Sequence, residues 1–227
     1  MSRFELMRIA VKAGAYEKPK RNNENIPDAK YDKVDKTCQE EVFLSNDGNV
    51  YVPQGSMDTI FNTTKQKGRF IYDNQLPDED KRTIDGVNAV KSSGVIGLLD
   101  KRSHETRDAE DAELDRYTRD SLIRIGDSDQ AEAVRRKLDT HTNKELPKLK
   151  KQRGSKCDEI TGEPLGKNSA FHHSNEKELF TDPVDVLDEN RGINVNFDTH
   201  KEIHKQKIRT EEELKENVES IRRALEK

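Results

Sequence analysis

CDEITGEPLGKNSAFHHSNEKELFTDPVDVLDENRGINVNFDTHKEIH, residues 157–204, is the most informative stretch of the chain. It holds four of the six histidines, as the adjacent pair His172 and His173 and as His200 and His204, which are four residues apart. Side chains four apart share one face of a helix, so the second pair could hold one metal ion. Residues 199–202 read Thr-His-Lys-Glu, a capping box, which predicts a helix that begins at Thr199.

The residue types in this stretch favour a catalytic metal site over a structural one. A structural zinc site takes four protein ligands, usually with thiolates among them, whereas Cys157 is the only cysteine nearby. The third ligand then has to come from His172 and His173, at the end of a predicted short strand. Successive strand residues face opposite sides, so one histidine can reach the ion. Its neighbour is suited to act as a general base, because an imidazole has a pKa near 6.5.

These residues resemble the HNH endonucleases of the ββα-metal fold, and their spacing is similar to that of the colicin-type DNases. The family pattern is a His-His or Asp-His pair, a loop, an Asn, a strand and a helix with H-x3-H, and the likeness covers about 48 of the 227 residues. It implies that His172, His200 and His204 ligate a divalent metal (Mg, Mn or Zn). It also implies that His173 is the general base and that Asn190 ties down the loop that orients it.

The chain departs from the family pattern in two places. Arg191 separates Asn190 from Gly192, where many relatives have Asn-Gly, so Asn194 and Asn196 remain alternatives for the motif Asn. Many relatives also carry two CxxC zinc knuckles around the site. Only Cys157 is present here, so that knuckle is absent or replaced.

Positive charge is concentrated just before this stretch. Residues 135–156 contain nine Lys or Arg against Asp139 and Glu145, although the whole chain has a net charge of −4. A positive strip beside a phosphodiesterase centre is typical of nucleic-acid backbone binding, although a solvated helix face gives the same pattern. The predicted partner is DNA, and the candidate contacts are Arg191, Lys201, Lys150, Lys151 and Arg153.

The overall composition bounds the class of protein. The chain is 30% hydrophobic and 38% charged with no Trp, which predicts a small core and solvated helices. Two cysteines far apart suit an intracellular protein without disulfides. No apolar run is long enough for a membrane span and no signal-peptide core is evident. We therefore expect a cytoplasmic protein without membrane contact.

The predicted fold class is α+β. Residues 1–150 are expected to form an accessory region with helices and a small sheet, and residues 151–227 an HNH-type module with a terminal helix. The expected elements are a helix over 2–11, a loop over 17–35, a hairpin over 41–53, a third strand over 67–72, helices over 77–90 and 103–124, a helix from 129 to Pro147, a basic linker over 148–156, strands ending at 173 and over 193–197, and a last helix from Thr210.

The predicted function is metal-dependent endonucleolytic hydrolysis of DNA, and the family resemblance implies products with a 5′-phosphate and a 3′-hydroxyl. Small HNH modules occur in phage and in defence proteins, and the sequence fits either setting. The alternative is a nucleic-acid- or protein-binding protein whose metal site is only structural. The chain could also form a homo-oligomer through its N-terminal region or its C-terminal helix, whose apolar face would pack on the module or on a second subunit.

Overall fold

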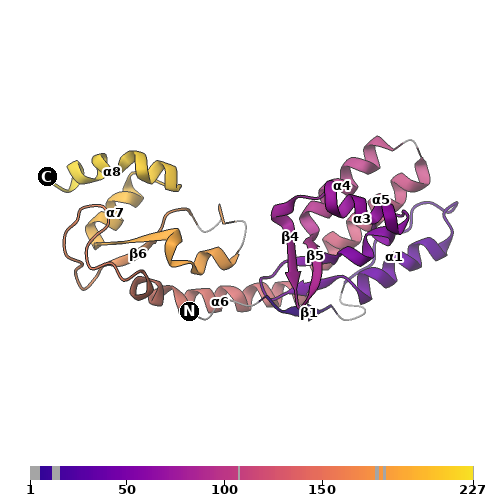
Figure 1. The fold of residues 1–227 in the computed structure, drawn as a ribbon, viewed down its shortest axis with the longest axis horizontal. Coiled ribbons are helices and arrows are strands. Elements are labelled where there is room, and N and C mark those ends of the chain that lie inside the picture. Colours follow the sequence, from indigo (N-terminus) through magenta and orange to yellow (C-terminus); the bar gives the residue numbers. More distant parts are fainter. Residues whose placement is uncertain (1–5, 12–15, 107, 177–178, 181–182, 227) are drawn as a thin grey trace. The chain divides into compact units, whose positions relative to one another are not determined.

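The computed structural model describes residues 6–11, 16–106, 108–176, 179–180 and 183–226. Helices and a small antiparallel sheet are both present, which confirms the predicted α+β class. The chain divides into two compact units, residues 1–137 and 138–227. Residue 150, near which we expected the boundary, lies within the long helix α6 (Asp129–Arg153), through which the chain passes from one unit to the next (Figure 1).

The first unit contains a five-stranded antiparallel sheet of order β1-β2-β3-β5-β4. Its strands are β1 (Arg8–Ala10), β2 (Phe43–Ser45), β3 (Val50–Pro53), β4 (Lys81–Ile84) and β5 (Val87–Lys91). The hairpin predicted within residues 41–53 is confirmed as β2 and β3, with Gly48 in its turn at a φ of +80°. Glycine suits this turn because a positive φ costs it little.

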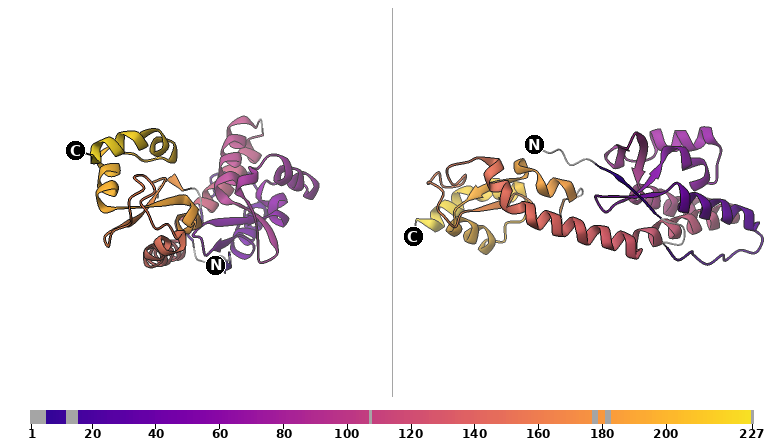
Figure 2. Two further views of the ribbon diagram at one scale, coloured as in Figure 1. Left: turned by 60° about the vertical axis from the view of Figure 1, so that its left-hand side comes forward. Right: turned by 90° about the horizontal axis from the view of Figure 1, so that it is seen from below.

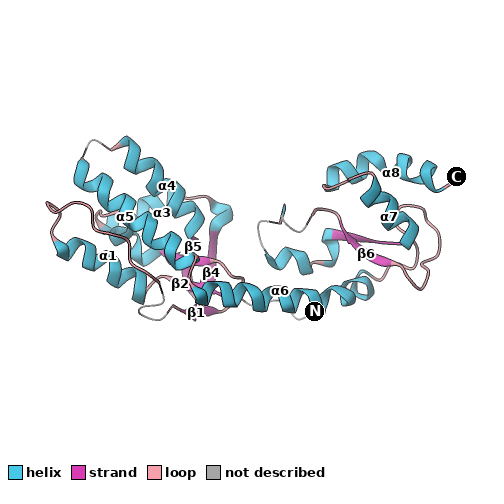
Figure 3. Cartoon of the chain, turned by 180° about the vertical axis from the view of Figure 1, so that it is seen from behind, coloured by secondary structure: helices cyan, strands magenta, loops and turns pink. Residues whose placement is uncertain are grey.

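The two faces of this sheet bury different residues, as the alternation of strand side chains requires. Leu44, Val50, Val52 and Val90 belong to the main core. The other face carries a smaller cluster that includes Phe43 and Tyr51. The helices of the unit are α1 (Asp28–Glu40), α2 (Met57–Ile60), α3 (Lys65–Asn74), α4 (Ser92–Glu105) and α5 (Ala109–Gly126). Figures 2 and 3 show these helices gathered beside the sheet.

The strand predicted over 67–72 is wrong, and the loop predicted over 17–35 is right only as far as residue 27, because the remaining residues are helical. Residues 67–72 lie in α3, whose N-cap Thr64 accepts a hydrogen bond from the Lys67 amide. The loop expected over 17–35 gives way to α1 at residue 28. In α1, Tyr31, Val34 and Cys38 are buried at spacings of three and four, so tertiary burial of this narrow stripe stabilises a helix rich in charge.

The predictions of a helix over 77–90 and of a helix over 2–11 are also wrong, because strands lie in both segments. Residues 81–91 form the β4–β5 hairpin, and Asp85 and Gly86 in its turn have φ values of +49° and +76°. These positive values are what a two-residue type I′ turn demands. Residues 8–10 form the edge strand β1, and residues 2–5 lie outside the described part of the chain.

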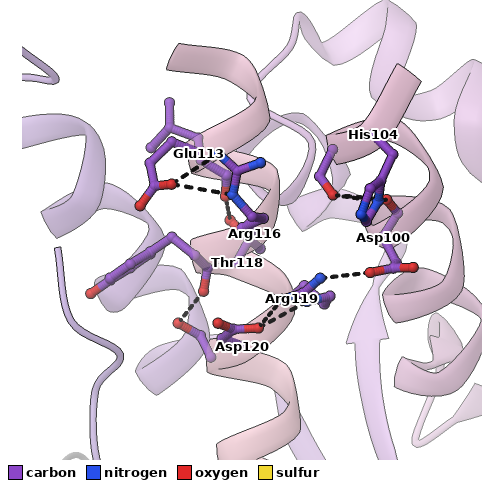
Figure 4. A network of polar contacts seen from close by, with 11 residues as sticks. Asp100, His104, Glu113, Arg116, Thr118, Arg119 and Asp120 are labelled. Atoms are coloured by element: carbon purple, nitrogen blue, oxygen red, sulfur yellow. Dashed lines mark hydrogen bonds and ion pairs between the residues drawn. The ribbon is translucent and has the colours of Figure 1, made fainter. Parts of the chain in front are cut away.

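The acidic helix predicted over 103–124 is two helices. The apolar run 95–99 lies in α4, which ends at residue 105. Helix α5 begins after Asp108, whose carboxylate accepts hydrogen bonds from the amides of residues 110 and 111. An ion pair of 2.6 Å between Arg119 Nη1 and Asp100 Oδ1 joins α5 to α4 (Figure 4).

Helix α6 continues through Pro147 to residue 153, so the linker predicted from residue 148 is wrong as far as Arg153. Contacts in the second unit hold this last part of the helix. Lys150 Nζ donates to Ser169 O at 2.7 Å, and Lys150 O accepts from Asn194 Nδ2 at 3.0 Å. Such contacts offset the cost of a proline inside a helix.

The second unit begins with the end of α6, and the strands and α-helices that follow have the order strand, strand, helix, helix. Strands β6 (Ala170–His173) and β7 (Gly192–Val195) pair antiparallel, and helices α7 (Phe197–Lys205) and α8 (Glu211–Leu225) follow. Figure 1 shows α7 between the hairpin and α8. The unit has its own core, built from Ile160, Val195, Ile203, Ile208, Leu214 and Ile221.

The last helix agrees with the prediction. Thr210 and Glu213 form the expected capping box, and Val218 and Leu225 pack with Leu214 and Ile221 against the core of the second unit. The predicted apolar face of α8 is therefore used within this unit. Among the described helices, none has the length and apolar character needed to span a membrane.

Candidate metal centre

Three histidines from two elements meet in the second unit. His172 lies on β6, while His200 and His204 lie one turn apart on α7. One nitrogen of each ring can be chosen so that all three lie within 4.8 Å of one another. His172 is buried, His200 half-buried and His204 exposed, so the cluster opens to solvent on one side.

The distances fit a common ion. His200 Nε2 and His204 Nε2 are 3.3 Å apart, and a tetrahedral ion with Zn–N bonds of 2.0–2.1 Å separates its ligand nitrogens by about 3.3 Å. The ring of His172 has its centroid 5.2 Å from that of His200 and 5.3 Å from that of His204. Small side-chain rotations would therefore bring all three nitrogens to bonding distance of one cation.

The charge state of the cluster also suits a metal. Burial, together with a smaller contribution from the neighbouring imidazoles His200, His204 and His173, lowers the pKa of His172 to about 4. Burial and His204 lower the pKa of His200 as well. At neutral pH these two rings are neutral, and a neutral imidazole is the form that binds a metal.

The donor set fits a divalent transition ion with an open coordination position. Among the described residues, three imidazoles meet here without a thiolate or a fourth protein ligand, which is typical of catalytic sites rather than structural ones, and imidazole accepts several metals. The three histidines line a cleft of about 490 Å³. A small substrate group could therefore reach an ion bound here.

His173 lines the same cleft but has a different environment. Its Nε2 lies 2.8 Å from the backbone oxygen of Val186, in the 3-10 turn η4 (Pro183–Leu187). A carbonyl oxygen only accepts, so Nε2 carries the proton and the lone pair of the neutral ring is on Nδ1. The rings of Phe171 and Phe180 stand edge-on to the His173 ring, and their centroids lie 5.2 and 6.0 Å from its centroid.

Gly192 also belongs to this site, although no role was predicted for it. It faces His173 across the β6–β7 pair. A Cβ atom at this position would lie 2.5 Å from His172 O and 2.5 Å from Phe171 Cζ. Only glycine therefore lets Phe171 pack over β7 and stand against His173.

Asn190 stabilises the loop that precedes β7. It lies in the short 3-10 turn η5 (Glu189–Arg191), where its backbone N and its Nδ2 both donate to Asp188 Oδ1, at 2.9 and 3.0 Å. The alternatives Asn194 and Asn196 have other partners. Asn194 Nδ2 donates to Lys150 O, and Asn196 Oδ1 accepts from Gly166 N at 2.8 Å. Each of the three residues therefore makes a local contact with the backbone or with a turn of the second unit.

Helix α7 begins at Phe197 after Asn196, so the predicted start at Thr199 is two residues too late. The strand predicted over 193–197 begins one residue and ends two residues later than β7. Thr199 is buried within the first turn. The Asn196 amide instead donates to Asp158 Oδ2 at 2.7 Å. The helix that carries the two histidines is therefore tied to residue 158.

Asp158 organises the turn that follows Cys157, where the sequence has no second cysteine to complete a CxxC knuckle. Asp158 Oδ1 accepts from the amides of Ile160 and Thr161, both at 2.9 Å, and a bridge pairs Cys157 with Pro164. Burial alone would raise the pKa of Asp158, but these hydrogen bonds and that from Asn196 outweigh it and hold the pKa below its usual value. A charged carboxylate thus closes the turn.

The predicted nucleic-acid contacts differ in their surroundings. Arg153 pairs with Glu159 at 2.7 Å, and Lys150 donates to a backbone carbonyl, so both stabilise the second unit itself. Arg191 lies 3.8 Å from Asp185 in a loose ion pair. Lys151 and Lys201 are exposed.

Two charged residues that were not predicted also line the cleft of the histidines. They are Glu176, which follows β6, and Arg209, which precedes α8. Their residue types and spacing gave no signal in the sequence, because the fold alone brings these two loops together.

No family model matches the chain, and no curated protein or solved structure matches it. The functional inference therefore rests on the residues of the cleft.

Proposed function

We propose that the chain is a metal-dependent endonuclease of the HNH type that hydrolyses phosphodiester bonds in DNA. The observation that carries the proposal is one cleft that holds three imidazoles converging within 4.8 Å and, beside them, a fourth imidazole with a different hydrogen-bond partner. The first three imidazoles would ligate the ion, and the fourth would accept a proton from the attacking water. A bound divalent ion would supply positive charge for the phosphate and for the leaving oxygen.

The tautomer of His173 is the one that a general base at Nδ1 requires. Because Nε2 donates to Val186 O, Nδ1 is the basic nitrogen. In the proposed reaction, Nδ1 takes a proton from water as the water oxygen bonds to phosphorus. The P–O3′ bond breaks, and the leaving oxygen takes a proton from solvent, giving a 3′-hydroxyl and a 5′-phosphate.

The surroundings of His173 would keep the ring in place during this step. Phe171 and Phe180 limit its rotation, and the bond to Val186 O fixes its tautomer. The neighbouring His172 is buried with a lowered pKa, so it would remain neutral and available as a ligand at the pH where His173 works.

Metal content and plasmid nicking test the proposal together. Wild type, His204→Ala, His173→Ala and the remote control His104→Ala would be assayed with Mg²⁺, Mn²⁺ and Zn²⁺. We expect His204→Ala to lose both the metal and nicking, and His104→Ala to retain both. His173→Ala should keep the metal but cleave about 10²- to 10⁴-fold more slowly, the usual effect of losing a general base.

Two results would contradict this function. Wild-type protein that binds one metal ion and leaves supercoiled plasmid intact under all three metals would support the alternative of a structural site. Full nicking activity in His173→Ala would remove this residue from the mechanism.

A further inference from the structure

The charges inside the histidine cleft point to a second component of the site. Among the described residues that line the cleft, Arg209 is the only lysine or arginine and Glu176 the only carboxylate. The two face each other, with Arg209 Nε 3.5 Å from Glu176 Oε1. Both side chains remain well exposed, at 62% and 44%.

The backbone of Arg209 is firmly held although its side chain is exposed. Its amide donates to Glu213 Oε2 at 2.7 Å, within the capping box of α8. Its carbonyl accepts from the Glu176 amide at 2.9 Å. Two residues further on, the amide of Glu211 donates to Asn175 Oδ1 at 2.8 Å. The backbone hydrogen bonds thus hold Arg209 in place, and its guanidinium group lies at the wall of the cleft.

The ion pair between the two side chains is weak. Charge-assisted hydrogen bonds between nitrogen and oxygen usually measure about 2.7–2.9 Å and are often bidentate for arginine, whereas the nitrogen and oxygen of this ion pair are 3.5 Å apart. Exposed pairs of this kind contribute little free energy. A better anionic partner could therefore displace the Glu176 carboxylate.

We propose that Arg209 is the phosphate-binding cation of this cleft and that Glu176 is a built-in competitor that occupies it when no substrate is bound. The proposal rests on the proposed function, since it assigns the phosphate group that the metal-bound cleft receives. A phosphodiester offers two non-bridging oxygens to the planar guanidinium fork. Glu176 must then turn away, and its negative charge opposes phosphate entry, so it limits affinity.

Phosphate binding by the metal-loaded full chain tests this assignment without requiring cleavage. Protein with one equivalent of Zn²⁺ would be titrated by calorimetry with inorganic phosphate and with a thymidine dinucleotide. The variants are Arg209→Ala, Arg209→Lys, Glu176→Gln and the control Arg223→Ala, an exposed arginine on α8 that does not line the cleft.

We expect Arg209→Ala to weaken binding of both ligands by about 10- to 100-fold, the usual loss for a hydrogen bond to a charged group. Arg209→Lys should fall between this variant and wild type, because it keeps the charge but loses the fork. Glu176→Gln should bind both ligands more tightly than wild type. Arg223→Ala should be unchanged, and Zn²⁺ affinity should be the same in all variants.

The outcomes separate this inference from the proposed function. If wild type nicks plasmid but Arg209→Ala keeps its phosphate affinity, or if Glu176→Gln binds phosphate more weakly, the assignment of these two residues is wrong and the nuclease stands. If wild type does not nick plasmid while Arg209→Ala loses phosphate affinity, the anion site stands and the nuclease is wrong. Wild-type protein that binds neither ligand would overturn the assignment.

Discussion

His172 and His173 are chemically identical and adjacent, yet the fold gives them different properties. Alternation along β6 sends His172 into a buried position against two other imidazoles, and burial lowers its pKa to about 4. His173 lies beside two aromatic rings and bonds to a backbone carbonyl. The same residue type thus yields a neutral ligand at one position and an oriented base at the next.

The low pKa of His172 predicts acid sensitivity of the metal-free protein. Between pH 6.5, the usual value for unfolded histidine, and about pH 4, the unfolded chain binds a proton that the folded chain does not. The free energy of unfolding therefore falls as pH decreases through this window, by about 3 kcal/mol for a shift of this size. His200, whose pKa is also lowered, changes stability in the same direction.

Urea unfolding followed by far-UV circular dichroism in EDTA, at pH 7.5 and pH 4.5, measures this effect. His172→Gln should lose much less stability between the two pH values than wild type, while the exposed control His104→Gln should behave as wild type. Equal losses in wild type and His172→Gln would mean that His172 does not carry the acid sensitivity.

The sequence identified the histidines because their chemistry is visible in residue type and spacing. It did not identify Gly192, Glu176 or Arg209. The role of Gly192 depends on a clash with Phe171, which exists only once β6 and β7 are paired. The other two residues meet only because the start of α8 is hydrogen-bonded to the loop after β6.

At the level of elements, local sequence signals predicted helix starts and turns correctly where no contact with a distant residue overrode them. The capping box at Thr210 and the hairpin around Gly48 were predicted correctly. The β4–β5 hairpin was missed although Asp85 and Gly86 are the residues that a type I′ turn favours. The start of α7 was misplaced because Asp158, which is far away in sequence, bonds to the Asn196 amide in preference to a local cap.

Helix α6 carries a stripe of exposed basic side chains. Lys137, His141, Lys144, Lys148 and Lys151 follow one another at spacings of four and three, which places them on one face. The stripe extends for about 21 Å at 1.5 Å per residue. Lys148 pairs with Glu145, whereas no ion pair of Lys144 or Lys151 exists within the described part of the chain.

We expect this stripe to contact DNA phosphates, so that its lysines set the salt dependence of binding. Replacing Lys144 and Lys151 by Gln should reduce the slope of log affinity against log salt by about 2, because each phosphate contact contributes about 0.9. The matched control is Lys20→Gln with Lys33→Gln, two exposed lysines of the first unit. Fluorescence anisotropy with a labelled duplex would give the slope for each protein. If the Lys144/Lys151 variant had the same slope as wild type, the stripe would be excluded as a DNA contact.

On the scale of the whole molecule, the low apolar content is divided between separate cores. The main core and the small sheet cluster lie in residues 1–137, and the cluster around Ile203 lies in residues 138–227. All five tyrosines belong to the first unit and are buried there, while the metal site belongs to the second. Tyrosine fluorescence therefore reports the unfolding of one unit alone, and far-UV circular dichroism reports both.

This division predicts that a metal ion stabilises only one of the two units. Zn²⁺ at about 100 times its dissociation constant should add about 2.7 kcal/mol to the unfolding free energy of the unit that binds it. In urea unfolding of the full chain, Zn²⁺ should shift the part of the circular dichroism transition that belongs to the second unit. The tyrosine transition should stay in place, and His204→Ala should abolish the shift. If both signals moved together with Zn²⁺, the two units would unfold as one cooperative block through α6, and their cores would not be energetically independent.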